Sequence, residues 1–236
     1  MVRGSKGAVV RVYIVRHGET QENRDGIIQG QRDTSLNATG MEQARMVGEA
    51  LKDAKLGIAF SSDLSRAAKT AEAILLHHPG ISLHKQVELR ERGMGELEGK
   101  RADVILGRAP RVMEPISKMT ARANVWWYEA VIAWIKAQDA VEPVNGREAT
   151  KGRRDVLIVS HGGLIGILLR NLCKGTVRVE KGVRLAKCMN ASITVIEIDS
   201  TSGKGKMIRY SDVSHLTGPM VEENVDVQNV DALPNE

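Results

Sequence analysis

The amino-acid sequence predicts an α/β fold, a three-layer sandwich in which a mostly parallel central sheet carries helices on both faces. Residues 8–15 and 156–160 are β-branched and apolar at odd and even positions alike, as in strands that are covered on both faces. Amphipathic stretches lie between the predicted strands, and such alternation produces right-handed crossovers and parallel pairing. With 236 residues and 42% hydrophobic content, the chain can bury one sizeable core.

Two amphipathic helices are predicted after the first strand. Thr39 and Glu42 have the spacing of a capping box, and the apolar stripe that follows indicates a helix ending near residue 55. A short strand at residues 58–61 comes next. Asp63 then stands where an N-cap is needed, so we expect it to start the second helix.

Polar segments without a helix or strand period are expected to be loops. They cover residues 21–36, 88–99 and 142–154, and the first of them is long for a connection inside a compact domain. Long ordered loops of this kind tend to be functional. Residues 101–115 fit no pattern.

The second half of the chain is expected to complete the core. Apolar residues recur at helical spacing from 116 to 137 and include the 3 Trp residues, which we place in the core rather than on a base-stacking surface. An apolar helix is predicted at residues 164–172. Residues 193–198 and 207–210 predict a pair of strands joined as a hairpin.

The charge distribution favours anionic partners. The formal charge is +5, but the stretch after Leu216 holds five acidic residues and no Lys or Arg, so the remainder has 34 basic against 24 acidic residues. Such a balance, about +10, attracts phosphorylated metabolites as well as nucleic acids or acidic lipids. We expect one domain over residues 1–215 and an acidic, flexible tail over residues 216–236.

Composition also limits the compartment and the class of site. Cys173 and Cys188 are too few and too far apart for a disulfide framework or a Cys-based zinc site. We find no apolar run long enough for a signal peptide or a membrane span. We expect a cytoplasmic protein with no membrane partner, no metal and no cofactor. Aromatic residues make up 3% of the chain, which argues against a nucleic-acid partner.

Two histidines occupy equivalent places in the predicted sheet. His17 and His161 each follow a buried strand directly and precede a glycine, Gly18 or Gly162. Ligands of parallel sheets bind outside the carboxyl ends of the strands, so the topology can bring both rings together. Neutral imidazole is a competent nucleophile toward phosphorus near pH 7, provided that the phosphoryl dianion is held and its charge neutralised.

Two arginines are candidates for holding the phosphoryl group. Arg16 precedes His17, and Arg66 lies in the first turn of a predicted helix, near unpaired backbone N–H groups and the positive end of the helix dipole. A guanidinium engages two phosphate oxygens with a planar fork and keeps its charge. We see no carboxylate cluster spaced for a metal.

Short motifs surround these residues along residues 10–175. They are Val15-Arg16-His17-Gly18-Glu19-Thr20 with Asn23, Gln29-Gly30 with Asp33, Leu36 and Gly40, Ser61-Ser62-Asp63-Leu64-Ser65-Arg66-Ala67 with Thr70, Leu89-Arg90-Glu91 with Gly95-Glu96-Leu97-Glu98-Gly99, and Ser160-His161-Gly162-Gly163. Together, in this order, they resemble the histidine phosphatase superfamily in its phosphoglycerate mutase-like branch. Any one tripeptide would be weak evidence, whereas the complete series is specific.

The resemblance implies a phosphoglycerate mutase-like fold and a metal-independent phosphatase without a cofactor. It makes His17 the nucleophile that forms a phosphohistidine, His161 its charge-stabilising partner, and Glu91 the proton donor to the leaving oxygen. The implied catalytic residues are His17, Glu91, His161, Arg16 and Arg66. The implied substrate-binding residues are Arg16, Asn23, Gln29, Gly30, Arg66 and Gly162. We therefore expect a phosphomonoester hydrolase acting on a small phosphorylated metabolite.

Alternatives to hydrolysis stay open at this point. A phosphoglycerate mutase shares the phosphohistidine and passes its phosphoryl group to a substrate hydroxyl instead of water, although the compact loop at residues 89–95 resembles the broad phosphatases more. A non-catalytic phosphoester-binding scaffold is a further alternative. The chain also departs from the family where it reads Glu114-Pro115-Ile116-Ser117 in place of a Gly-Glu-Ser element. Residues 100–111 fit either a lid that reads a second anionic group or a solvated loop.

Overall fold

The computed structural model describes residues 8–104, 113–139 and 155–217. In this part of the chain, seven strands form one sheet in the order β3-β2-β4-β1-β6-β7-β5. The strands are β1 (Val9–Arg16), β2 (Leu56–Ser62), β3 (Leu83–Gln86), β4 (Asp155–Ser160), β5 (Val177–Val179), β6 (Ile193–Asp199) and β7 (Gly205–Asp212). The first four strands of that order pair in parallel, and β6 pairs antiparallel with both β1 and β7. The mostly parallel sheet is thereby confirmed.

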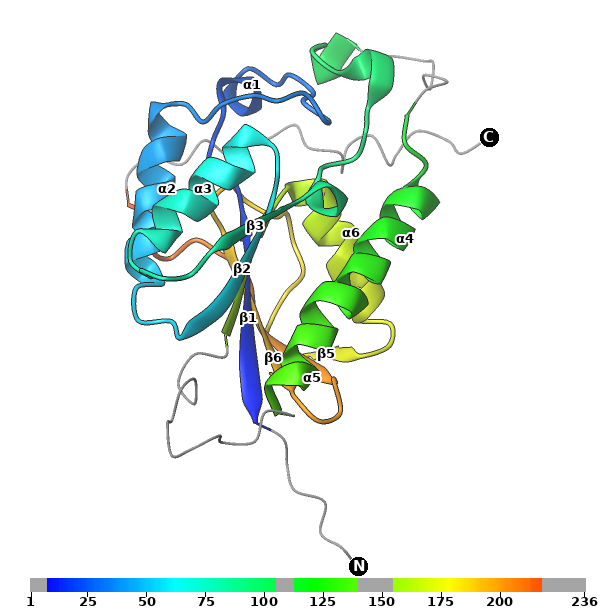
Figure 1. Ribbon diagram of the computed structural model, residues 1–236. Helices are drawn as coiled ribbons and strands as arrows, with labels where there is room; N and C mark the ends of the chain where they lie inside the picture. Colours follow the sequence, from blue (N-terminus) through cyan, green and yellow to red (C-terminus); the bar gives the residue numbers. More distant parts are fainter. Residues whose placement is uncertain (1–7, 105–112, 140–154, 218–236) are drawn as a thin grey trace, which may run out of the picture.

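Helices cover both faces of the sheet (Figure 1). The α-helices are α1 (Gln21–Arg24), α2 (Ala38–Ala50), α3 (Ser65–Leu75), α4 (Ile116–Trp126), α5 (Ala133–Asp139) and α6 (Gly162–Leu172). A π-helical stretch at Trp127–Ile132 joins α4 to α5, and short 3₁₀ turns lie at Val87–Leu89, Gly95–Leu97 and Ala102–Val104. In the view of Figure 1, α2 and α3 lie on one side of the strands and α4, α5 and α6 on the other. The described chain is therefore the predicted three-layer sandwich.

Alternation along the buried strands divides the core into two clusters. Val10, Val12 and Ile14 of β1 face α4 and α6, whereas Val15 faces α2 and α3. Burying each of these aliphatic side chains contributes roughly 1.5–3 kcal/mol. Trp126 and Trp127 lie in the first cluster at 5% and 1% exposure, so the prediction that they are core residues is confirmed.

Helix starts differ from the sequence prediction. Asn37, not Thr39, caps α2, because its side-chain oxygen accepts the N–H of Gly40 at 2.8 Å. The predicted capping box was wrong, since Glu42 pairs with the next turn of the helix instead. Residue type alone does not tell which of two neighbouring cap formers the chain direction selects.

The second helix also starts without its predicted cap. Asp63 forms an ion pair with Arg90, while the carboxylate of Asp33 accepts the N–H of Ser65 at the start of α3. A distant carboxylate therefore replaces the local one. The residue 21–36 loop likewise contains α1, whose capping box joins Thr20 to Asn23. β5 was not predicted either, since three residues carry too short a pattern.

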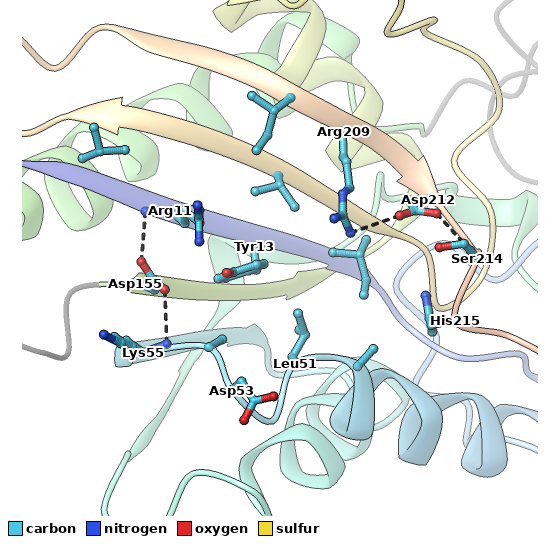
Figure 2. A pocket seen from close by; sticks show the side chains of 16 residues that line it. Arg11, Tyr13, Leu51, Asp53, Lys55, Asp155, Arg209, Asp212, Ser214 and His215 are labelled. Atoms are coloured by element: carbon cyan, nitrogen blue, oxygen red, sulfur yellow. Dashed lines mark hydrogen bonds and ion pairs between the residues drawn. The ribbon is translucent and has the colours of Figure 1, made fainter.

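The sheet face on the α2 side contains a cavity beside β1, β6 and β7. The cavity has a volume of about 710 Å³, with Tyr13, Ile208 and His215 in its lining (Figure 2). The carboxylate of Asp155, which also lines it, accepts the backbone N–H groups of Arg11 and Lys55, as Figure 2 shows. None of the predicted site residues lines this cavity.

Some predictions fall on other parts of the chain. The loop at residues 142–154, nearly all of the acidic tail and most of the segment at residues 100–111 lie outside the described residues. Arg101, at the start of that segment, is paired with Asp103. Within the described residues, the helices are all too short or too polar to cross a membrane.

Candidate functional site

The strand register brings the two histidines together. β1 and β4 are parallel neighbours in which Arg16 pairs with Ser160, so His17 and His161 leave the same edge of the sheet side by side. Their ring centroids lie 5.1 Å apart with 60° between the ring planes. The backbone N–H of His17 also donates to the carbonyl oxygen of Ser160 at 3.0 Å. Two residues far apart in the chain thus share one site.

A backbone hydrogen bond fixes the orientation and tautomer of His17. Its Nδ1 lies 2.7 Å from the carbonyl oxygen of Gly18. Because a carbonyl oxygen only accepts hydrogen bonds, Nδ1 must carry the proton, and the Nε2 lone pair remains available when the ring is neutral. Gly18 is required here, since a Cβ on it would lie 2.4 Å from the carbonyl oxygen of Gly40.

Both histidine rings are held neutral near pH 7. Burial, followed by the charges of Arg66 and Arg16, lowers the pKa of His17 well below its usual value. Burial and the same two guanidinium groups, together with His17, lower the pKa of His161 in the same way. Within the described chain, neither ring nitrogen of His161 has a hydrogen-bond partner. Both ring nitrogens of His161 are therefore available to contact a bound ligand.

The two arginines bring positive charge to the same place. Arg16, fully buried at the end of β1, donates from Nη1 to the carbonyl oxygen of Cys188 at 2.6 Å. Arg66, in the first turn of α3, donates to the carbonyl oxygens of Gly30 and Arg32 at 2.9 and 2.8 Å. Buried cations of this kind favour an anionic ligand over a neutral one.

The loop containing Gln29 and Gly30 borders Arg66. Gly30 has a φ of +52°, and a Cβ there would meet the carboxylate of Glu98 at 2.3 Å, so glycine is needed. The side-chain oxygen of Gln29 accepts the hydroxyl of Thr34. Gln29, a residue that is 6% exposed, thereby stabilises the loop from its buried side.

Asn23 turns its amide nitrogen away from its structural contacts. Its side-chain oxygen accepts the backbone N–H of Thr20 at 3.2 Å and the Nδ2 of Asn190 at 3.2 Å. In the described part of the chain the Nδ2 of Asn23 has no partner, although it is buried. It is a donor suited to an anionic ligand.

Asn190 was missed by the sequence analysis. Its Nδ2 also lies 3.0 Å from the carbonyl oxygen of His17 and 3.3 Å from that of Gly18. Because β6 runs antiparallel to β1, the segment before β6 reaches the edge where β1 ends. Knowing that β6 pairs antiparallel with β1 would have placed Asn190 at the site. The sequence pattern predicted only that the last two strands form a hairpin, not which strand they join.

Glu91 reaches the second histidine from another loop. Its Oε1 accepts the N–H of Arg92 and its Oε2 that of Gly163, both at 2.8 Å. Gly163 lies in the first turn of α6, which begins at Gly162 directly after His161. The positive end of this helix favours a carboxylate at that point. A Cβ on Gly163 would lie 2.6 Å from Oε1 of Glu91.

The sequence analysis also missed an ion pair that contacts the loop carrying Glu91. Arg122 of α4 forms an ion pair with Glu114, and the Oε2 of Glu114 also accepts the N–H of Gly93. Glu114 belongs to the segment that departs from the family pattern, and in the structure it contacts the loop that carries Glu91. Among the described residues, no group of three or more His, Cys, Asp or Glu side chains is placed to hold a metal ion.

The fold and the site define an α/β protein whose sheet edge presents two neutral histidines beside two buried arginines. Residues 12–211 match the Histidine phosphatase superfamily (branch 1). The chain belongs to that superfamily, whose members include phosphatases and phosphoglycerate mutases and act on small phosphorylated substrates.

Similar proteins carry both kinds of name. A "probable phosphatase" of Schizosaccharomyces pombe is 30% identical over 220 residues, which cover 88% of this chain and 95% of the relative. "Probable phosphoglycerate mutase GpmB" of Salmonella paratyphi A is 31% identical over 220 residues, covering 91% and 99%. The structure of a mycobacterial glucosyl-3-phosphoglycerate phosphatase matches with a TM-score of 0.66 and 25% identity, covering 86% of this chain and 99% of that chain.

Proposed function

We propose that this chain is a metal-independent phosphomonoester hydrolase that acts on small phosphorylated metabolites through a phosphohistidine on His17. The observation that carries the proposal is the state of His17: a neutral ring that donates from Nδ1 to the carbonyl oxygen of Gly18, packed against the ring of His161 and close to two buried guanidinium groups. This is the arrangement that nucleophilic attack on a phosphoryl dianion requires.

In the proposed first step, Nε2 of His17 forms a bond to phosphorus as the bond to the ester oxygen breaks. Arg16, Arg66, His161 and Asn23 would bind the phosphoryl oxygens, and their charge and N–H groups favour the transition state because phosphoryl transfer depends mainly on positioning and electrostatics. The negative charge of a bound phosphoryl group disfavours a second anion beside it, so Glu91 would enter this step protonated in spite of its N–H contacts. It would give that proton to the departing alkoxide, which is otherwise a poor leaving group.

In the proposed second step, water attacks the phosphohistidine. The Glu91 carboxylate left by the first step takes a proton from that water, the P–N bond breaks, and inorganic phosphate leaves as His17 returns to its neutral form. The substrate-binding roles of Gln29, Gly30 and Gly162 are indirect in this scheme. They shape the loop beside Arg66 and the start of α6.

Replacing His17 tests this function. We expect His17→Asn to abolish phosphate release from p-nitrophenyl phosphate and from a panel of sugar phosphates, whereas EDTA leaves the wild-type rate unchanged. Acid-labile phosphate should be trapped on the wild-type protein only. His77→Asn, at an exposed site past the end of α3, is the matched control and should retain full activity. Turnover by His17→Asn would contradict the proposal.

Mutase activity is the second candidate, because relatives at 31% identity bear the name phosphoglycerate mutase. Incubation with 3-phosphoglycerate and its bisphosphate primer separates the two reactions. The proposal predicts inorganic phosphate, whereas 2-phosphoglycerate as the main product would favour the mutase. A wild-type chain that binds phosphate but turns over no ester on a broad panel would favour a scaffold.

A further inference from the structure

We infer that Arg122 is a positioning residue for Glu91: it sets the conformation of residues 88–93, called here the acid loop, and thereby the efficiency of proton transfer to the leaving group. The inference rests on the proposed function, because it concerns the residue to which that function assigns the proton. Arg122 lies on α4, which packs against α6 in the layer beside the acid loop (Figure 1).

The acid loop depends on side-chain donors for its conformation. The carbonyl oxygens of Glu88, Arg90 and Glu91 accept N–H groups of Arg122 at 2.6, 2.8 and 3.0 Å. Within residues 88–91, the carbonyl oxygen of Leu89 accepts the hydroxyl of Ser160 at 2.8 Å. Four consecutive carbonyls are thus satisfied by side chains, and three of them by one guanidinium group.

Glu114 fixes the guanidinium in return. Nε of Arg122 donates to Oε1 of Glu114 at 2.8 Å, and Nη2 donates to Oε2 at 2.9 Å. The side chains are 17% and 10% exposed, so solvent offers little competition. Glu114 also binds the loop directly, since its backbone N–H donates to the carbonyl oxygen of Gly93 at 2.7 Å.

An arginine is specifically required at this position. The five N–H groups of Arg122 meet five acceptors: the carbonyls of Glu88, Arg90 and Glu91 and both carboxylate oxygens of Glu114. Lysine offers three donors on one nitrogen and cannot bridge acceptors on several sides. Arg122→Lys therefore keeps the charge and removes most of the geometry.

The connection to catalysis runs through the backbone of Glu91. Its carbonyl is held by Arg122, while its carboxylate is held by the N–H groups of Arg92 and Gly163. Without Arg122 the backbone side of this arrangement loosens and the carboxylate moves relative to the leaving oxygen. A misplacement of about 1 Å can cost about 100-fold in the step concerned.

Leaving-group dependence measures this effect. p-Nitrophenyl phosphate releases a weakly basic phenolate that needs little protonation, whereas an alkyl phosphate such as glycerol phosphate releases a strongly basic alkoxide. The ratio kcat/KM covers the steps up to departure of the alcohol. We expect Arg122→Lys to lower kcat/KM for the alkyl ester by roughly 10- to 100-fold and for the nitrophenyl ester by less than about threefold.

Two comparisons separate positioning from general stability. Arg45→Gln breaks an Arg–Glu pair of the same bidentate kind on the exposed face of α2, so it should leave both kcat/KM values unchanged. In a Glu91→Gln background, Arg122→Lys should cause no further loss on the alkyl ester, because the group that it positions no longer transfers a proton. Glu114→Gln, a milder change, should show the same leaving-group pattern if Arg122→Lys does not fold.

The outcomes distinguish this inference from the function beneath it. Equal losses on both esters in Arg122→Lys and in Glu114→Gln, or full additivity with Glu91→Gln, would overturn the positioning role of Arg122. If Glu91→Gln itself shows no leaving-group dependence, the proton-donor role in the proposed function fails instead. If His17→Asn is inactive and Arg122→Lys loses more activity on the alkyl ester than on the nitrophenyl ester, the results support both the proposed function and the positioning role of Arg122.

Discussion

The side-chain amide of Asn190 donates to the side-chain oxygen of Asn23 at 3.2 Å and so decides which way the Asn23 amide faces. The same nitrogen lies 3.0 Å from the carbonyl oxygen of His17. Ala191, the next residue, has a left-handed φ of 54° and donates its N–H to that same carbonyl. A non-glycine residue held in this conformation costs free energy, which is common beside functional sites.

Asn190→Asp should damage the site without removing any proposed catalytic group. The change replaces a donor by a charged acceptor that faces the oxygens of Asn23, His17 and Gly18, so repulsion replaces three contacts. We expect a loss of about 1–3 kcal/mol in the free energy of unfolding and a fall in kcat/KM that is similar for alkyl and nitrophenyl esters. Urea denaturation and phosphatase assays measure both. Asn171→Asp, at the far end of α6, is the control, and equal effects of the two changes would count against this role.

Gly163→Ala should displace Glu91 directly. A Cβ would lie 2.6 Å from Oε1 and 3.1 Å from Oε2 of Glu91, so the carboxylate must move away from the N–H groups that hold it. We expect kcat/KM for alkyl esters to fall by about 10- to 100-fold, with a smaller loss for p-nitrophenyl phosphate. Gly175→Ala, where an added Cβ meets nothing within 4 Å, should leave both values unchanged. An unaltered alkyl-ester rate in Gly163→Ala would show that Glu91 tolerates displacement.

The fold could be predicted largely because its signals are local. The buried runs that became β1 and β4 were apolar on both faces, and the helical stripes of α2, α3 and α4 had the period that burial demands. The caps were predicted less well. The start of α3 depends on distant partners: Arg90 engages Asp63, and Asp33 accepts the N–H of Ser65 in its place.

The site residues likewise divide into those that local sequence signals predict and those that depend on distant contacts. His17 and His161 were placed by strand ends, and their proximity follows from the pairing of β1 with β4. Arg122 and Asn190 carried no such signal, because one lay in an ordinary amphipathic helix and the other in a turn. Their contacts are with backbone carbonyls of other segments, and a sequence pattern does not record which carbonyls a fold brings within reach.

Gly40→Ala should destabilise the chain where α2 meets the turn after β1. A Cβ on Gly40 would lie 2.0 Å from the carbonyl oxygen and 2.7 Å from the nitrogen of Glu19, and backbone atoms cannot move aside as a side chain can. We expect the free energy of unfolding to fall by about 3 kcal/mol. Activity should also fall, because Glu19, which the added Cβ would displace, lies two residues after His17. Met41→Ala, at the exposed neighbouring position, is the control for both measurements. Stability equal to that of the control would refute the close packing.

Lowering the pH below neutrality should destabilise the ligand-free protein through its buried histidines. Burial chiefly lowers the pKa of His17, His161 and His215 in the folded chain, whereas the unfolded chain protonates them near pH 6.5. Above that pH the rings are neutral in both states and contribute no pH dependence. Below it the unfolded state binds more protons, so stability falls with pH by up to about 1.4 kcal/mol per pH unit for each ring. Urea midpoints at pH 7.5 and 5.5 should therefore differ less in His17→Asn than in the wild type, whereas His77→Asn should match the wild type. An identical pH dependence in all three proteins would mean that His17 takes up its proton in the folded chain as readily as in the unfolded one.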